Sequence, residues 1–300
     1  MKTSPSFKAR DAASYDPVAE TFDRLSRRFS APLARRMVSL AGLHPGDRVL
    51  DVGTGTGIVA LEAVARVLPG GSVLGIDLSE GMLETARSRA VAGVEFRRMD
   101  AEALELEDGS FDVVLSLFAL LHFPDPLRAL REMHRVLRPG GRLVLAVGSG
   151  PPLVSLDGFR AGLRRVAEIG RKLLGRELTA PGFLDHIVET QFPERERHET
   201  THLAQGHGKT HSVPALVREA GFLSVRTSWE GYRPVVETPE EFWEVQHTYS
   251  SLARKRLADA TPEMVSRVRE KFLEASRRVL ARGGRLRYPY AAFFVAARRA

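Results

Sequence analysis

A glycine-rich turn at residues 53–57 limits the folds open to this chain more than any other feature of its sequence. The turn reads G-T-G-T-G, follows the apolar run Arg48–Val52, and leads into a helical pattern that begins at Ile58. Glycine adopts positive φ angles and lets a backbone approach a ligand closely, while the free N–H groups of a helix start face that ligand. An apolar strand, a tight turn and a helix in this order predict a ligand-binding βα unit.

Short β-rich runs and amphipathic helical patterns alternate as far as residue 147. Such alternation is typical of βαβ units and therefore of a parallel sheet. Beyond residue 147 the sequence becomes helix-rich, and it ends on a run that predicts a last strand. After the first strand at Arg48–Val52, the expected strands are Val73–Asp77, Val94–Met99, Phe111–Ser116, Arg142–Val147, 224–232 and Tyr290–Ala297; the expected helices are 57–68, 80–90, 126–137, 155–174 and two that open at Thr238 and Thr261.

Three acidic residues stand at the ends of successive predicted strands. Asp51 precedes the glycine turn, Asp77 closes the second run and Asp100 follows the third. The spacing G-x-G-x-G differs from the dinucleotide pattern G-x-G-x-x-G, and a carboxylate before the turn disfavours a pyrophosphate and favours a positively charged amino-acid group. Asp77 is placed to accept both hydrogen bonds of a ribose diol, and Asp100 one from an adenine amino group.

These residues resemble those of the class I S-adenosylmethionine-dependent methyltransferases, and within them the group that includes ubiquinone and menaquinone biosynthesis methyltransferases. The glycine turn is similar to the family's motif I, Leu78–Met82 to its second motif and residues 100–101 to its adenine-binding pair. Ser110–Val114 is similar to the family's fourth strand and Leu137–Leu143 to the entry of its fifth.

The resemblance implies S-adenosylmethionine as the cofactor and a Rossmann-like α/β fold. Its seven-stranded, mostly parallel sheet would have the order 3-2-1-4-5-7-6, with helices on both faces and an antiparallel last strand. The resemblance is close over residues 12–148 and holds only in outline beyond them. It implies a helical lid at 1–45, a cofactor-binding core at 46–148, and at 149–300 the remainder of the same fold with a helical insertion on the acceptor side at about 237–285.

The resemblance also assigns residues to the cofactor site. The glycines would wrap the methionine moiety, and Tyr15 in the lid would contact the cofactor, although a packing role for that aromatic ring is the alternative. The full set implied to bind S-adenosylmethionine is Tyr15, Asp51, Gly53, Thr54, Gly55, Gly57, Asp77, Leu78, Met82, Asp100, Ala101 and Ser116.

Methyl transfer from a sulfonium is an in-line displacement, so the protein mainly orients the reactants and holds the charged donor. A general base is needed only when the acceptor is a hydroxyl, a carbon acid or a protonated amine. His122 follows the fourth predicted strand and is the candidate base, with a packing histidine as the alternative. The implied acceptor is a small lipophilic or aromatic metabolite, with O- or C-methylation favoured over N-methylation.

Two further groups of side chains invite a functional interpretation. Four histidines, His198, His202, His207 and His211, have helical spacing, but neighbouring glycines favour a loop, so we expect no metal site; they are also candidates to line the acceptor site. Aromatic side chains in the C-terminal half are candidates for an apolar pocket wall, and aromatic residues at such spacing are more often core. These are Phe183, Phe192, Trp229, Tyr232, Phe242, Trp243 and Tyr249.

Composition excludes several classes of protein and partner. The chain has no cysteine, which excludes disulfides, thiolate metal sites and a cysteine nucleophile. It has no secretory signal and no apolar run long enough to span a membrane, so we expect a cytoplasmic protein. The net charge of +7 arises entirely in residues 151–300, where arginines interspersed with glutamates indicate a solvated surface.

The sequence leaves three alternative functions open. A nucleic-acid methyltransferase would suit the positive charge, but residues 116–119 read Ser-Leu-Phe-Ala, without the Asn/Asp-Pro-Pro-Tyr motif of amino-methylating enzymes, and the carbon-5 pyrimidine mechanism needs a cysteine. A dehydrogenase is disfavoured by the glycine spacing. A non-catalytic protein that binds S-adenosylmethionine is the third, because fold does not imply function.

Overall fold

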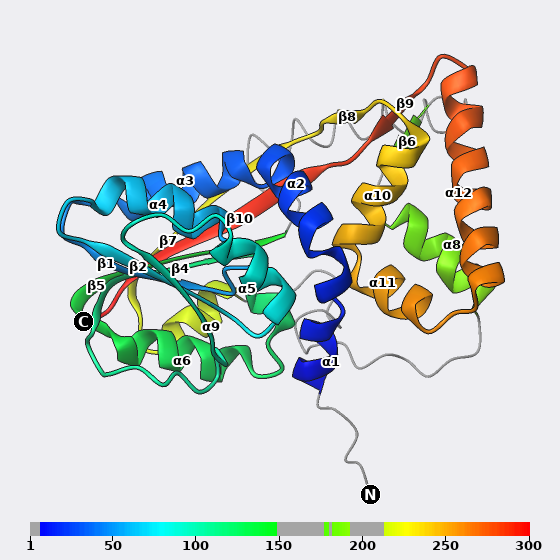
Figure 1. Ribbon diagram of the computed structural model, residues 1–300. Helices are drawn as coiled ribbons and strands as arrows, with labels where there is room; N and C mark the ends of the chain where they lie inside the picture. Colours follow the sequence, from blue (N-terminus) through cyan, green and yellow to red (C-terminus); the bar gives the residue numbers. More distant parts are fainter. Residues whose placement is uncertain (1–6, 149–176, 180–181, 193–212) are drawn as a thin grey trace, which may run out of the picture. The chain divides into compact units, whose positions relative to one another are not determined.

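The alternating runs of the sequence pair into one seven-stranded sheet (Figure 1). The computed structural model describes residues 7–148, 177–179, 182–192 and 213–300. Strand order is β3-β2-β1-β4-β5-β10-β7, which confirms the predicted order because β7 and β10 are the sixth and seventh strands of this sheet. The strands are β1 Arg48–Val52, β2 Ser72–Asp77, β3 Val94–Arg98, β4 Phe111–Leu117, β5 Leu137–Gly148, β7 Leu223–Tyr232 and β10 Tyr290–Arg298.

Strand direction brings the predicted site to one edge of this sheet. β1 runs parallel to β2 and β4, with Leu50 opposite both Leu74 and Val114. β10 runs antiparallel to β5, as predicted. Because parallel strands end at the same edge, the segments that follow β1, β2, β3 and β4 meet there, which is where open α/β sheets bind their ligands.

The side chains of the sheet alternate between two buried faces. Leu50 and Val52 of β1 pack in one hydrophobic cluster with α6 (Pro126–Val136) and α9 (Val213–Glu219). Helices α3 (Ala31–Ala41) and α4 (Ile58–Val67) pack against the strands from the opposite side (Figure 1). Burial of both faces explains why the strands read as nearly continuous apolar runs.

The N-terminal segment forms four short elements. α1 spans Phe7–Ala13, a 3₁₀ turn η1 spans Asp16–Val18 and α2 spans Ala19–Phe29, followed by α3. α2 is fixed to the residue two positions past α5 (Glu80–Arg87) by the ion pair of the buried Asp23 with Arg89.

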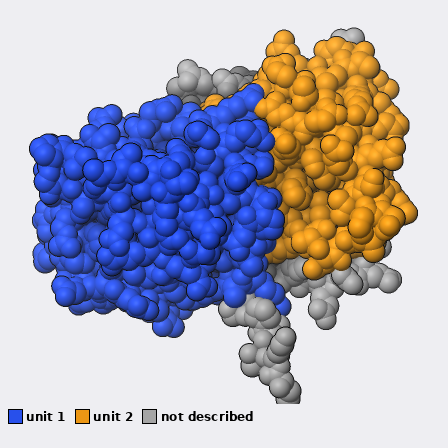
Figure 2. Space-filling view, viewed as in Figure 1, with its two compact units in different colours: residues 1–149, 199–230, 292–300 blue, residues 150–198, 231–291 orange. Residues whose placement is uncertain are grey.

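The chain folds into two compact units (Figure 2). Unit 1 comprises residues 1–149, 199–230 and 292–300, and unit 2 comprises 150–198 and 231–291. Unit 2 contains the predicted helices opened by Thr238 and Thr261, whose hydroxyls accept the backbone N–H of Glu241 and Met264, and a small sheet, order β6-β9-β8, that was not predicted. Its elements are β6 Glu177–Thr179, α8 Phe183–Gln191, β8 Val235–Val236, α10 Pro239–Tyr249, α11 Ser251–Ala258, α12 Pro262–Ala281 and β9 Arg285–Arg287.

Aromatic side chains form the interior of unit 2. Phe272 is fully buried, and its ring centroid lies 5.1, 5.5 and 5.4 Å from those of Phe183, Phe242 and Trp243. These three predicted aromatics therefore pack as core. Four of the five tyrosines form a second cluster, with neighbouring centroids 5.5 to 6.1 Å apart: Tyr232, Tyr249, Tyr288 and Tyr290.

Some of the predictions fall outside the described residues or stay predictions. The expected helix at 155–174 and the four histidines from His198 to His211 lie outside the described residues. The division into a lid at 1–45, a core at 46–148 and a remainder at 149–300 stays a prediction. In the described ranges, no helix combines the length and apolar character required to cross a bilayer.

Candidate cofactor and methyl-transfer site

The glycine turn adopts the conformation for which its sequence was singled out. Gly53, Gly55 and Gly57 have φ angles of +70°, +54° and +83°. A Cβ atom on Gly53 would lie 2.2 Å from the Cβ of Ala119, and one on Gly57 would lie 2.7 Å from the Phe96 ring. The backbone thus passes close to two neighbouring elements, and only glycine meets both the angle and the space.

Asp51 lies buried beneath this turn. Its Oδ2 accepts hydrogen bonds from the Thr54 hydroxyl at 2.6 Å and from the Ala60 N–H at 3.1 Å. Its Oδ1 is buried and has no hydrogen-bond partner in the part of the chain that the structure describes. Burial raises the pKa of Asp51 to about 7, and the negative charge of Asp77 contributes in the same direction. A buried carboxylate oxygen without a donor is suited to a cationic ligand group.

Asp77 ends β2 beside the turn. Its Oδ2 accepts the N–H of Gly55 at 2.9 Å, and its Oδ1 accepts the N–H of Ser79 at 3.0 Å. Burial raises the pKa of this carboxyl, while the backbone hydrogen bonds oppose the rise. Each oxygen keeps a second lone pair, so the fixed carboxylate is still able to accept from a diol.

Asp100 follows β3 and is joined to the N-terminal helix. The Lys8 ammonium lies 2.8 Å from Asp100 Oδ2 and 2.6 Å from Glu102 Oε2. Burial lowers the pKa of Lys8, but the hydrogen bonds to the two carboxylates outweigh it and raise that pKa overall. Lys8 and Glu102 were not identified from the sequence.

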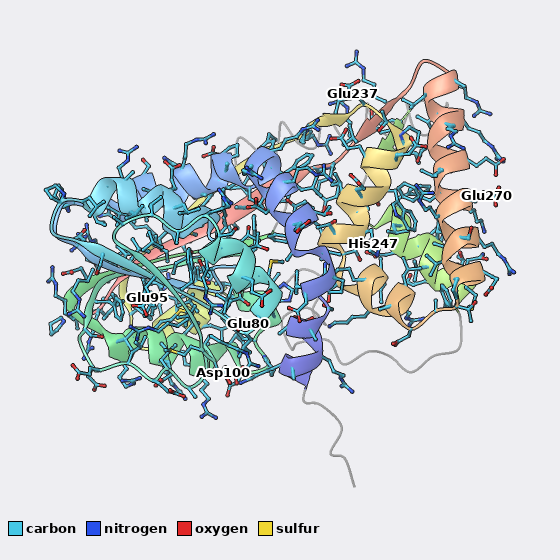
Figure 3. All side chains as sticks on the ribbon, viewed as in Figure 1. Glu80, Glu95, Asp100, Glu237, His247 and Glu270 are labelled. Atoms are coloured by element: carbon cyan, nitrogen blue, oxygen red, sulfur yellow. The ribbon has the colours of Figure 1, made fainter. Side chains whose placement is uncertain are left out.

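A cavity of about 420 Å³ opens beside Asp100, which is labelled with Glu80 in Figure 3. Its walls come from α1, η1, the segment after β2 and the end of β3, all within unit 1. The lining residues are Lys8, Ala9, Ala12, Ala13, Asp16, Leu78, Glu80, Arg98 and Asp100. The predicted cofactor-binding residues Leu78 and Asp100 therefore line one cavity.

His122 stands in a chain of three polar side chains. It ends the 3₁₀ turn η2 (Leu120–His122), its Nδ1 lies 2.8 Å from Oδ2 of the buried Asp11, and its Nε2 lies 3.3 Å from the Tyr15 hydroxyl. An ionised Asp11 accepts from Nδ1–H, which leaves the lone pair on Nε2. The turn begins just after Phe118, a non-glycine residue at φ +65°, and strained backbone of this kind concentrates at functional sites.

Four predicted residues have their side chains held in the protein interior. Met82 and Ala101 pack in the hydrophobic core, so only their backbones are free to face a ligand. The buried Ser116 hydroxyl donates to the carbonyl of Val52 at 2.9 Å, and Thr54 donates to Asp51. These contacts give the side chains of Ser116 and Thr54 a structural role in shaping the strand ends and the turn.

The N-terminal helix contributed Lys8 and Asp11, which sequence reasoning missed. Together with the predicted Tyr15 they recur at intervals of three and four, which places them along one side of a helical path. This spacing was the signal in the sequence from which Lys8 and Asp11 could have been found. Asp16 was missed too: its Oδ1 accepts from the Ser79 hydroxyl at 2.6 Å and the Gly81 N–H at 3.1 Å, fixing η1 to the start of α5.

Known proteins with related sequences bear on this geometry. A family model described as a methyltransferase domain matches residues 50–145. A demethylmenaquinone methyltransferase of Thermus thermophilus is 38% identical over 190 residues, covering 61% of this chain and 86% of the relative. A nocamycin O-methyltransferase of Saccharothrix syringae is 33% identical over 242 residues, covering 73% and 84%. The crystal structure of the YcgJ protein of Bacillus subtilis has a TM-score of 0.51 at 20% identity, over 89% of this chain and 97% of that one.

The sheet order, the glycine turn and the carboxylates at the strand ends define a Rossmann-like methyltransferase. With relatives at this identity and coverage, the chain belongs to the class I S-adenosylmethionine-dependent methyltransferases, in the group that includes the demethylmenaquinone methyltransferases. It is therefore an enzyme, and its cofactor is S-adenosylmethionine. The described residues fit this cofactor, because the buried Asp51 Oδ1 lacks a donor and the cavity beside Asp100 is open.

Proposed function

We propose that this enzyme methylates an oxygen or carbon atom of a small lipophilic or aromatic metabolite, with His122 as the general base. The chain Asp11–His122–Tyr15 carries the proposal, because it holds a histidine, with a carboxylate at its Nδ1, near the strand ends where the cofactor would bind. Relatives named for demethylmenaquinone and nocamycin support this acceptor class. Nothing in the described residues favours a nucleic-acid acceptor.

The geometry of the strand ends supports an assignment of the cofactor residues. Asp51 would face the ammonium of the methionine moiety, Asp77 would hold the ribose diol and Asp100 the adenine amino group. The cofactor supplies an electrophilic methyl carbon on a positively charged sulfur. The protein contributes orientation, and the carboxylates of Asp51 and Asp77 make the site favourable for a cation.

The proton of the acceptor determines what His122 does. An acceptor hydroxyl or acidic C–H loses its proton to Nε2, and the resulting imidazolium is stabilised by Asp11 at Nδ1. Tyr15 donates to the same Nε2 in the absence of acceptor, so the phenol would have to turn away or pass the proton on. Asp11 is a positioning residue because it acts through the histidine.

The location of the protein and its partners complete the proposal. We place the enzyme in the cytoplasm, and we assign it a small-molecule methyl acceptor as its partner. The histidines from His198 to His211 remain candidates to line the acceptor site. No group of metal-binding side chains is found among the described residues, and no step above requires one.

A turnover assay with four acceptor classes tests the proposal. Purified enzyme and methyl-labelled S-adenosylmethionine are offered a reduced naphthoquinone, a simple phenol, an alkyl amine and a generic RNA. We expect label in the first or second only, and a loss of about 10²- to 10⁴-fold in kcat for His122→Gln, the range for a removed general base. Cofactor affinity should be unchanged in that variant.

The exposed His44 provides the matched control, because His44→Gln leaves the site intact. Transfer to RNA or to the amine alone would overturn the acceptor class. Full activity of His122→Gln on the accepted substrate would overturn the base.

A further inference from the structure

We propose that Lys8 is a latch that holds α1 over the adenosine end of the cofactor pocket. The bound adenine takes one of its two carboxylate partners, and the ammonium keeps α1 in place through the other. The inference rests on the assignment of Asp100 to the adenine amino group. It goes beyond methyl transfer, because it concerns how the cofactor is admitted and retained.

The two carboxylates that face Lys8 are fixed by the backbone. Asp100 Oδ1 accepts the N–H of Glu102 at 2.9 Å, and Glu102 Oε1 accepts the N–H of Asp125 at 3.0 Å. Their remaining oxygens, Asp100 Oδ2 and Glu102 Oε2, both reach the same ammonium. Lys8 is therefore held by two rigid acceptors, of which one is the predicted adenine ligand.

An adenine amino group and Lys8 are rival donors to the same oxygen: Oδ2 has two lone pairs, but the positively charged ammonium repels the amino hydrogens, so each donor weakens the bond of the other. Asp100 Oδ2 lies at the cavity wall, where its side chain is 34% exposed, whereas the Glu102 side chain is only 7% exposed. A ligand entering the cavity therefore meets Asp100 and not Glu102. When the adenine takes Asp100, the ammonium retains its contact with Glu102, and α1 stays attached above the base.

Lys8 is one of several residues that hold α1 in place. Among residues 8–13 the only buried side chain is Asp11, which binds His122. The face toward the cavity carries Ala9, Ala12 and Ala13, whose small side chains leave the space open. Residues 8–13 bury little apolar area, and a lid held by polar contacts opens more readily than one held by buried apolar area, so loss of the Lys8 ion pairs should speed its opening.

Removing the Lys8 ammonium has two separable effects on the rates of cofactor binding. Lys8→Met frees Asp100 from a competitor, which speeds association, and detaches α1 from Glu102, which speeds dissociation. Glu102→Gln leaves the competition for Asp100 in place and weakens only the retained contact, so it speeds dissociation alone. A merely structural lysine would not raise both rate constants.

Surface plasmon resonance with immobilised full-length enzyme and S-adenosylhomocysteine measures both rates. We expect koff to rise about three- to fivefold in Lys8→Met and Glu102→Gln, the size of a partly exposed ion pair, and kon to rise only in Lys8→Met. Lys8→Arg should restore the slow koff. Lys271 is an exposed residue of α12, so Lys271→Met is the control, and both of its rate constants should match those of wild type. Hydrogen exchange at residues 8–13 should slow on ligand addition in wild type and much less in Lys8→Met.

Unchanged rate constants in Lys8→Met, with a melting temperature equal to wild type, would overturn the latch. Asp100→Asn separates this result from an error in the adenine site. If Asp100→Asn leaves S-adenosylhomocysteine affinity unchanged, Asp100 does not hold the adenine and the exchange is refuted. If Asp100→Asn weakens binding while Lys8→Met has no effect, the adenine site stands and only the latch is lost.

Discussion

Asp51 is the residue whose pKa the surrounding protein changes most clearly. In the free protein its carboxyl is protonated below about pH 7, because burial raises its pKa to about that value. A cationic ligand binds the ionised form, so affinity for S-adenosylhomocysteine, with its ammonium group, should strengthen as pH rises from 6 to 8. The slope is limited to about tenfold per pH unit for one coupled proton.

Isothermal titration at pH 6, 7 and 8 measures this dependence, and Asp51→Asn should bind more weakly with a flatter profile. Because binding releases this proton to the buffer, the measured binding enthalpy should vary with the ionisation enthalpy of the buffer. An equally steep profile in Asp51→Asn would assign the titration to another group, and Asp51 would lose its place beside the ammonium.

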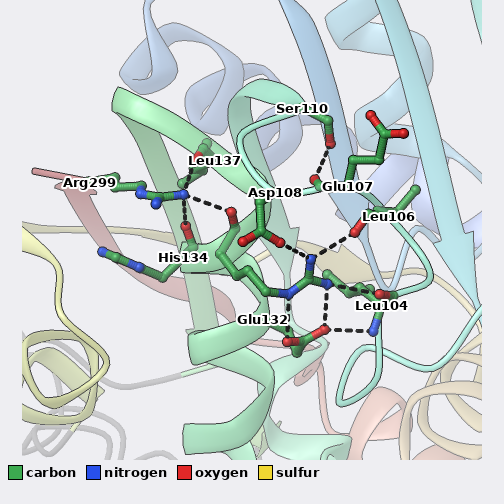
Figure 4. A network of polar contacts seen from close by, with 10 residues as sticks. Leu104, Leu106, Glu107, Asp108, Ser110, Glu132, His134, Leu137 and Arg299 are labelled. Atoms are coloured by element: carbon green, nitrogen blue, oxygen red, sulfur yellow. Dashed lines mark hydrogen bonds and ion pairs between the residues drawn. The ribbon is translucent and has the colours of Figure 1, made fainter.

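At the scale of elements, the end of α6 shows how one side chain completes a helix. The last carbonyls of a helix have no partner within it. The Arg299 Nη1 donates to the carbonyls of Leu137, Arg135 and His134, the latter two at 2.7 and 3.1 Å (Figure 4). The chain terminus thereby fixes α6 against β5, while Arg135 ties the same helix to the loop that follows β3.

Arg299→Ala should lower the free energy of unfolding by about 1 to 3 kcal/mol, because three helix-end carbonyls lose a charged donor. Arg298, the preceding residue at the end of β10, is exposed, so Arg298→Ala is the matched control and should stay within about 0.5 kcal/mol of wild type. Urea denaturation followed by circular dichroism measures both. Equal stability of the two variants would show that the hydrogen bonds from Arg299 to the end of α6 contribute nothing to the free energy of unfolding.

The elements also show which parts of the structure the sequence predicts. Strands β1 to β4 and the caps at Thr238 and Thr261 were predicted because apolar runs and capping residues act locally. β6 and β8 span three and two residues, too short for any period to show. Asp11 and His122 lie 111 residues apart, and only the packing of α1 on the core brings them together.

At the scale of the whole molecule, the chain builds two units from interleaved segments. Each cofactor-binding residue predicted from the sequence belongs to unit 1, and so do Lys8, Asp11 and His122. Unit 2 has its own aromatic core around Phe272 and its own small sheet. Its arginines are paired in several places, as Arg277 is with Glu240 and Arg278 with Glu274, which accords with a solvated surface.

Two separate cores predict that damage to one unit spares the chemistry of the other. Phe272→Ala removes a fully buried ring that contacts Phe183, Phe242 and Trp243, and a truncation of this kind costs about 3 to 5 kcal/mol. We expect an early thermal transition of unit 2 in calorimetry, with S-adenosylhomocysteine affinity at low temperature close to wild type. Phe272→Leu, which keeps most of the volume, should recover most of the lost stability. Loss of cofactor binding in step with the loss of unit 2, in both variants, would show that the two units fold as one and that the cofactor site depends on both.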